Sequence, residues 1–223
     1  GLPGGALMEE AVDPAELLRG LGQQWHLTQN YFKLHSCCRF NHGTLDAIDK
    51  IAARGALPAP EQIRQVHVDS YAYAAELDDP APRNTLAAKF SVPFAVATRI
   101  VNGSSALASF SWDAVRDTRV LELARRVTVR EDPQMTLRLP LERPARVRIM
   151  LTDGSSLQGE VGVNRGDDAL PYSRAELREK FMNLSTRVWP QAHAAQVLEA
   201  TLGMAAGGTS FSAWTRLLRQ PAR

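Results

Sequence analysis

The run from Ala145 to Val163 constrains the fold of this 223-residue chain more than any other segment. Two stretches rich in apolar and β-branched residues, 145–151 and 156–163, flank the turn residues 152–155, which read Thr-Asp-Gly-Ser. Such a turn between two strand-like stretches predicts a β-hairpin. Because the strands of a hairpin pair in antiparallel fashion, the sheet of this chain is expected to be at least partly antiparallel.

The other patterns predict helices before, between and after the strands. Their order lacks the regular alternation of a doubly wound parallel sheet, so we predict an α+β fold. We expect a two-layer α/β sandwich with a largely antiparallel sheet, followed by C-terminal helices. Asn41 is expected to cap one helix, and Pro93 to bend another or mark a boundary in it. The expected helices are 13–25, 41–53, 85–101, 113–127, 173–184, 192–202 and 210–218, and the remaining strands are 63–73 and 127–130.

Charge and apolar runs exclude several classes of protein. Lys and Arg total 26 and Asp and Glu 24, a formal charge of +2, which argues against nucleic acid as the main partner. The longest strongly apolar stretch, 92–97, is too short to span a membrane, so no membrane partner is expected. The two cysteines, Cys37 and Cys38, are adjacent and would not cross-link distant parts of the fold, which favours a reducing, cytoplasmic setting. The chain begins at Gly1, and we expect it to be a fragment or processed piece.

Reactive side chains are densest in residues 33–42, which read Lys-Leu-His-Ser-Cys-Cys-Arg-Phe-Asn-His. This segment leads from a loop into a helix, and the free N–H groups of a helix start attract anions. Arg39 can bind a carboxylate through two parallel hydrogen bonds, and Lys33 or His42 could transfer a proton. The segment therefore has the residue types of a pocket for a polycarboxylic acid. Surface or capping roles for the same residues are equally compatible with the spacing.

A metal site and a nucleophilic cysteine are less favoured in this segment. His35 and His42, with the cysteine pair, could supply zinc ligands. Adjacent cysteines rarely both reach one ion, however, and no Cys-x-x-Cys pair exists, so we expect no metal. Cys38 would act as a nucleophile only with a lowered pKa and a base beside it, and the alternative is a cysteine that simply packs in the core.

Three blocks of the sequence resemble, in the same order, the MmgE/PrpD family. The first, 33–47, is similar to a family pattern of a lysine, a Cys-Cys or Pro-Ala pair, a histidine and then Asp-Ala, here Asp46-Ala47. The second, 82–97, resembles the family's Ala-Lys-x-Ser-x-x-x-x-Val-Ala helix. The third, 166–181, resembles its glycine loop and Glu-Leu-x-x-Lys-Phe helix. The resemblance extends over 17–184.

The resemblance implies a domain arrangement. Family members combine a large helical domain with a smaller α+β domain and bind their substrate between the two. By this likeness 1–24 is the end of an upstream helical region, 25–170 is the α+β domain, and 171–223 is a helical tail packing on the helical domain. The resemblance further implies a homodimer, and catalytic groups in a helical domain that this chain would lack.

The resemblance also implies a chemistry and a set of site residues. Family activities include 2-methylcitrate dehydratase, cis-aconitate decarboxylase and iminodisuccinate epimerase. They act beside a carbon activated by a carboxylate and need no redox cofactor. Lys33 matches the family's active-site lysine, and Cys38 stands where some members carry a functional histidine. The predicted catalytic residues are Lys33, His42 and Cys38, and the predicted substrate-binding residues are Arg39, His35, Arg83 and Lys89; Tyr71 and Tyr73 are weaker candidates.

We therefore predict part of a cofactor-independent lyase or isomerase for small di- or tricarboxylic acids. A hydro-lyase of the 2-methylcitrate dehydratase type is the leading form. In it, a lysine or histidine removes a proton next to a carboxylate while positive charge stabilises the enolate-like intermediate. The alternative is a non-catalytic α+β assembly module, or an inactive fragment, in which the three blocks serve packing and an interface. His35 and Ser36 replace the aromatic and proline of many members, so the sequence does not define the substrate.

Overall fold

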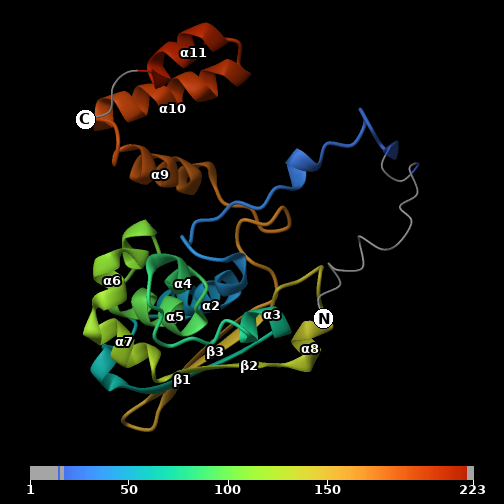
Figure 1. The fold of residues 1–223 in the computed structure, drawn as a ribbon. Helices are drawn as coiled ribbons and strands as arrows, with labels where there is room; N and C mark the ends of the chain where they lie inside the picture. Colours follow the sequence, from blue (N-terminus) through green and yellow to red (C-terminus); the bar gives the residue numbers. More distant parts are fainter. Residues whose placement is uncertain (1–14, 16–17, 220–223) are drawn as a thin grey trace.

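A single four-stranded sheet organises the chain in the computed structural model, which describes residue 15 and residues 18–219 (Figure 1). The strands are β1 (Ile63–Ser70), β2 (Val127–Glu131), β3 (Ala145–Leu151) and β4 (Ser156–Val161), in the order β2-β1-β3-β4. β1 pairs with β2 in parallel, whereas the β1–β3 and β3–β4 pairs are antiparallel. The predicted α+β fold with a largely antiparallel sheet is confirmed, and so is the hairpin, which turns at Gly154 with a φ of +89°.

Helices pack on one face of this sheet, as Figure 1 shows for α2, α5 and α7. Short helices and 3-10 turns connect these elements. The helices are α2 (His42–Ala52), α3 (Ala72–Ala75), α4 (Thr85–Lys89), α5 (Val92–Val101), α6 (Trp112–Arg116), α7 (Thr118–Ala124), α8 (Pro133–Thr136), α9 (Arg174–Ser185), α10 (Gln191–Ala205) and α11 (Phe211–Leu218); the 3-10 turns are η2 (His26–Gln29), η3 (Arg39–Asn41), η4 (Pro60–Gln62) and η5 (Leu107–Phe110).

The main core lies between the sheet and this helical layer. Alternate strand residues such as Val66 and Ile149 are fully buried, and they pack with α2 and α5 through side chains such as Leu45 and Phe94. The opposite face of the sheet carries polar side chains, for example Arg146. This division follows from the two-residue period of a strand and makes the sheet and helices a two-layer sandwich.

Helix α2 lies unusually close to the sheet because glycines stand at the contact. A Cβ atom on Gly159 of β4 would overlap the backbone carbonyl oxygen of Ala47, and one on Gly43 would lie 2.9 Å from the carbonyl oxygen of Arg143. The missing side chains let the helix backbone approach the strands directly. Since the reactive segment 33–42 leads directly into α2, this contact fixes where that segment lies.

Three predicted elements are wrong in detail, and capping explains two of them. The helix predicted at 85–101 is two helices, because Ser91 caps α5 by accepting the Phe94 N–H, which leaves Pro93 in the first turn. The helix predicted at 113–127 is likewise divided at Asp117, which caps α7. The strand predicted at 63–73 ends at Ser70 because the chain turns into α3.

Two further expectations concern helix starts. Asn41 does not cap α2 through its side chain; its amide instead donates to the carbonyl of Lys89, 3.0 Å away. In the helix predicted at 13–25, Asp13, Pro14 and Leu17 lie outside the described residues, and the chain forms turns from Arg19 onward.

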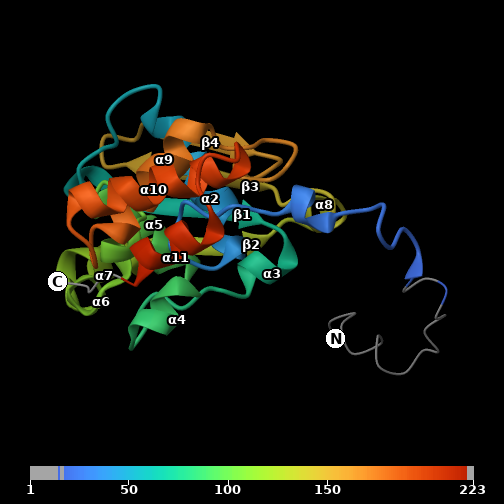
Figure 2. The ribbon, with the colours of Figure 1, turned by 90° about the horizontal axis from the view of Figure 1, so that it is seen from above.

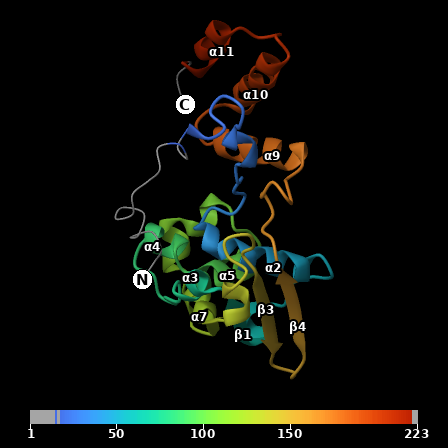
Figure 3. The ribbon, with the colours of Figure 1, turned by 90° about the vertical axis from the view of Figure 1, so that its right-hand side faces the viewer.

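The C-terminal helices extend away from the sheet beyond the helical layer, as Figures 1 and 3 agree. α10 and α11 lie side by side (Figure 2), joined by a 2.9 Å hydrogen bond from Trp214 to Thr201 and a 3.1 Å bond between His193 and the Leu217 carbonyl. Their membership in a separate helical domain, and the domain boundaries 1–24, 25–170 and 171–223, stay predictions. Within the described residues, no helix combines the length and apolar character needed to cross a membrane.

Candidate functional site

The predicted residues of the segment 33–42 are close in the chain but differ in accessibility. Lys33 is exposed, Cys38 and Arg39 are half-buried, and His35 and His42 are buried. The segment passes from a loop through the turn η3 into α2, so its side chains point in several directions. The structure thus divides the predicted residues into an accessible group around Arg39 and a buried group around the two histidines.

His42 is fully buried and has a hydrogen-bond partner on each ring nitrogen. Nε2 lies 3.3 Å from the carbonyl oxygen of Cys37, to which it donates, and Nδ1 lies 2.6 Å from the hydroxyl of Tyr31, from which it accepts. Burial, and next the neighbouring His35, lower the pKa of His42 to about 3. The ring is therefore neutral at physiological pH. Its catalytic role stays a prediction, and the geometry favours a role in positioning Tyr31 and Cys37.

The burial of neutral His42 is expected to make the protein less stable in acid. In the unfolded chain His42 takes up a proton near pH 6.5, whereas the folded protein resists protonation down to about pH 3. Between these values the unfolded state binds more protons, so the free energy of unfolding falls as pH falls. The full shift corresponds to at most about 5 kcal/mol.

Denaturant unfolding at pH 7 and pH 4.5 measures this effect. The loss of unfolding free energy between the two pH values should be smaller for His42→Gln than for the wild type. His67→Gln, on the open face of the sheet, should retain the wild-type loss, and equal losses in all three proteins would contradict the assignment.

Arg39 is held in place by two contacts, and one of its buried N–H donors is left without an acceptor. Its guanidinium stacks over the ring of Tyr31, 3.9 Å from the ring centroid, and Nη2 forms an ion pair with Asp167. Its Nε atom is buried and has no hydrogen-bond partner among the described residues. A buried N–H without an acceptor costs free energy, so this orientation favours an acceptor that arrives with a ligand.

Tyr71 supplies a second buried donor without a partner. It follows β1 directly, is 1% exposed, and packs edge-on against Phe40 at a ring separation of 5.9 Å. In the part of the chain that the structure describes, its hydroxyl has no hydrogen-bond partner. Burial raises the pKa of Tyr71, and Arg143 and Arg39 partly oppose this while Cys38 reinforces it. Tyr71 therefore carries its proton and lies within the electrostatic influence of Cys38 and Arg39.

The two cysteines differ in their surroundings. Cys37 is buried, and burial raises its pKa to about 12, so it is a protonated thiol in the core. Cys38 is half-buried, and its backbone N–H donates to the carbonyl of Lys89, 2.9 Å away. Both thiols are free. Only Cys38 is thus placed where a ligand could touch it.

The remaining predicted cations are Lys33, Lys89 and Arg83. The ammonium of Lys33 lies 3.4 Å from the carbonyl oxygen of Cys37, and the Lys33 carbonyl in turn accepts a hydrogen bond from Lys180 of α9. Lys89 is the last residue of α4, and its carbonyl accepts the hydrogen bond from the Cys38 N–H, which connects α4 to the segment 33–42. Arg83 is exposed in the loop before α4. The binding roles of Arg83 and Lys89 stay predictions.

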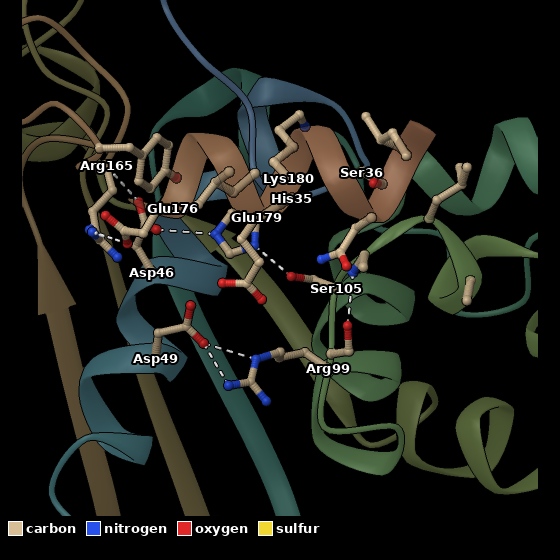
Figure 4. Close-up of a pocket in the computed structure, with 18 of the residues that line it drawn as sticks. His35, Ser36, Asp46, Asp49, Arg99, Ser105, Arg165, Glu176, Glu179 and Lys180 are labelled. Carbon is tan, nitrogen blue, oxygen red and sulfur yellow. Dashed lines mark hydrogen bonds and ion pairs between the residues drawn. The ribbon is translucent and has the colours of Figure 1, made fainter. Parts of the chain in front are cut away.

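A second group of residues, which includes the buried His35, lines a cavity of about 530 Å³ (Figure 4). His35 Nδ1 is 2.5 Å from the hydroxyl of Ser105, and His35 Nε2 is 3.1 Å from a carboxylate oxygen of Asp46. The other oxygen of Asp46 accepts the backbone N–H of Arg165, 2.9 Å away. Of the predicted site residues, only His35 lines this cavity.

The same cavity holds one group of side chains with the spacing of metal ligands. His35, Asp46 and Asp49 can bring one ligand atom each to within 4.8 Å of one another. Asp49 is already paired with Arg99, at 2.8 Å, so a metal ion would have to compete with this ion pair for the carboxylate. The expectation that the protein binds no metal stays a prediction.

The sequence does not indicate Ser105, and it makes Tyr71 only a weaker candidate. Ser105 lies 70 residues from His35, and a serine after Asn102-Gly103 carries no local signal of such a contact. The buried hydroxyl of Tyr71, which has no acceptor among the described residues, is what makes this residue a stronger candidate in the structure. Asp46 entered only as part of the resembling block 33–47.

Comparison with known proteins gives a family match over most of the chain. A family model described as the MmgE/PrpD C-terminal domain matches residues 35–204. The match includes every predicted site residue except Lys33, which lies two positions before it begins.

Curated relatives are similar over nearly the same range. A cis-aconitate decarboxylase of Aspergillus terreus is 28% identical over 204 residues, which is 85% of this chain and 40% of the relative. A second cis-aconitate decarboxylase of that species is also 28% identical. A cis-aconitate decarboxylase-like protein of Aspergillus oryzae, oryM, is 24% identical over 188 residues, 78% of this chain and 38% of the relative. The chain thus spans about two fifths of the length of these relatives.

Proposed function

The chain belongs to the MmgE/PrpD family, and on that premise we propose that it forms part of a cofactor-independent lyase acting on small di- or tricarboxylic acids. The relatives named as cis-aconitate decarboxylases support this class of substrate. Because the chain spans about 40% of those relatives, the proposal assigns the rest of the active site to a helical domain packed against this one. A homodimer and a cytoplasmic location are part of the proposal.

One observation carries the proposal: buried donors near the start of α2 lack an acceptor among the described residues. They are the Nε–H of Arg39 and the hydroxyls of Tyr71 and Thr44, and the proposal assigns the first two to the ligand. A carboxylate offers acceptors only, and charge-assisted hydrogen bonds to it are roughly twice as strong as neutral ones. We infer that one substrate carboxylate accepts from both groups, which would remove the cost of leaving them unpaired.

The proton-transfer step is assigned to Lys33. Lys33 is exposed in this chain, and a lysine acts as a base at neutral pH where its amine is desolvated. A helical domain packed over the segment would bury it. Lys33 would then take a proton from the carbon beside a carboxylate, and the electron pair of the broken C–H bond would form an enolate-like intermediate. Arg39, Lys89 and Arg83 supply positive charge that stabilises this intermediate.

The alternative is an assembly module without catalytic function, and the C-terminal helices favour it. Within the described residues, neither α9 nor α11 has a buried residue, and Phe211 is 70% exposed. Exposed apolar side chains on amphipathic helices are typical of surfaces that pack against another domain. The two functions differ in what they require: only the lyase needs the donors of Arg39 and Tyr71 to bind a carboxylate and Lys33 to transfer a proton.

Tyr71→Phe is expected to weaken tricarboxylate binding without destabilising the fold. The change removes only the hydroxyl, which has no partner in the protein, so the free energy of unfolding should stay equal or rise by up to about 1 kcal/mol. Loss of one hydrogen bond to a charged ligand should raise Kd for cis-aconitate by roughly 10- to 100-fold. Titration calorimetry on the protein expressed from its full reading frame measures the Kd, and urea unfolding measures the stability.

Tyr73→Phe provides the matched control. Tyr73 stacks on Phe40 as well, at a ring separation of 5.7 Å, so its substitution removes a neighbouring hydroxyl of the same kind. Both Kd and stability should remain at wild-type values in this variant. If Tyr71→Phe leaves Kd unchanged, or lowers stability as the loss of a satisfied hydrogen bond would, the carboxylate site is placed wrongly.

A further inference from the structure

Ser105, His35 and Asp46 form a continuous chain of hydrogen bonds that the proposed lyase does not use. Ser105 comes from the loop between α5 and η5, His35 from the loop before α2, and Asp46 from α2 itself (Figure 4). The links measure 2.5 Å from Ser105 Oγ to His35 Nδ1 and 3.1 Å from His35 Nε2 to Asp46 Oδ1. All three residues are at least nine-tenths buried.

The hydrogen-bond partners define where the protons lie. Asp46 accepts from His35 on one oxygen and from the Arg165 N–H, 2.9 Å away, on the other, as an ionised carboxylate does. His35 Nε2 therefore carries a hydrogen, and in the neutral ring Nδ1 is an acceptor. The hydroxyl of Ser105 then donates to Nδ1. This is the arrangement in which an imidazole draws a proton from a serine and a carboxylate orients the ring and stabilises its charged form.

The chain of hydrogen bonds opens into the cavity. Both Ser105 and His35 line this space, whose volume of about 530 Å³ lies within the range of small-molecule sites. Arg99 and Lys180 line it as well, together with apolar side chains such as Leu107. Lys33, Arg39 and Tyr71, the residues of the proposed lyase site, do not line it.

We propose that Ser105 is a nucleophile, activated by His35 and Asp46, that takes the acyl group of small carboxylic esters. The Oγ–H proton passes to His35 Nδ1 while Oγ attacks the ester carbonyl. An Oγ–acyl bond forms, the ester C–O bond breaks, and the departing alcohol takes the proton from His35. Water then attacks the acyl group and gives a proton to His35. The Oγ–acyl bond breaks, and Ser105 Oγ takes that proton back from His35. The carboxylic acid leaves, so the net reaction is ester plus water giving acid plus alcohol.

A fluorophosphonate probe tests the nucleophile directly. Ser105 Oγ would attack phosphorus, an O–P bond would form, and fluoride would leave as the serine proton moves to His35. Peptide mass spectrometry of the labelled protein, expressed from its full reading frame, should place the adduct on Ser105. A chain of hydrogen bonds that served only to tie the loop at Ser105 to α2 would give no adduct. Absence of the adduct on folded wild-type protein would overturn the proposal without any variant.

Variants then test the activation of Ser105. His35→Gln and Asp46→Asn should each lose the adduct, whereas Ser104→Ala should retain it. Ser104 is the neighbouring serine, and its hydroxyl accepts the Ala106 N–H at 3.1 Å instead of binding His35. Thermal melts identify variants that remain folded. Labelling of Ser105 that persists in a folded His35→Gln protein would also overturn the proposal.

Hydrolysis of p-nitrophenyl acetate provides a turnover measurement. Removal of the base or the nucleophile should lower the rate by roughly 100-fold, the lower end of what a positioned general base contributes. The expected order is wild type equal to Ser104→Ala, with Ser105→Ala and His35→Gln near the uncatalysed rate. Equal rates in wild type and Ser105→Ala would contradict the assignment.

Discussion

Replacing Lys33 with alanine is expected to lower turnover of cis-aconitate or a related tricarboxylate by roughly 100- to 10,000-fold, the contribution of a positioned general base. The substitution removes an exposed side chain that makes, among the described residues, one long hydrogen bond of 3.4 Å to the Cys37 carbonyl. Stability should therefore change by less than about 0.5 kcal/mol. A steady-state assay of the protein expressed from its full reading frame, with Kd measured in parallel, separates the loss of kcat from a loss of binding.

Lys50→Ala is the matched control for this experiment. Lys50 is an exposed lysine near the end of α2 and bonds the Glu160 carbonyl, far along the helix from the reactive segment. Its variant should keep the wild-type kcat. An unchanged kcat in Lys33→Ala would remove the proposed base and would favour the assembly module.

Gly159→Ala is expected to be the most destabilising small substitution in the sheet. The added Cβ would overlap the carbonyl oxygen of Ala47, so α2 has to move away from β4. Overpacking against backbone costs about 3 kcal/mol, which lowers the melting temperature by roughly 6–12 °C in a chain of this size. Calorimetry or a thermal melt measures this shift.

Gly55→Ala separates the packing effect from the general effect of replacing a glycine. Gly55 has an ordinary φ, and its Cβ would meet no atom within 4 Å. The free energy of unfolding should change by less than about 0.5 kcal/mol. A loss as large as that of Gly159→Ala would contradict the close approach of α2 to β4.

The sequence predicted the fold well where the signal was local. The hairpin followed from a turn containing Gly154 between two apolar stretches, and the bounds of β3 are as predicted. The divided helices were misjudged because apolar periodicity continues across Ser91 and Asp117. Their side chains, which cap the next helix, outweigh that continuity. Periodicity reports which face is buried, whereas the cap decides where a helix begins.

The candidate site was predictable only in part for a similar reason. Residues 33–42 are contiguous, so their chemistry was visible in the sequence, and the structure keeps them around the start of α2. The partners that complete each group come from distant segments: Tyr71 from the end of β1, Ser105 from the loop after α5, and Asp167 beyond β4. Contacts across such distances depend on how α2 packs on the sheet, which periodicity does not specify.

A crystal structure of the protein, expressed from its full reading frame and grown with cis-aconitate, tests the central claim most directly. The account predicts a carboxylate of the ligand within hydrogen-bond distance of both Arg39 Nε and the Tyr71 hydroxyl, with Lys33 facing the adjoining carbon. A ligand bound elsewhere, or both donors paired with protein atoms or water while the ligand is bound, would contradict it.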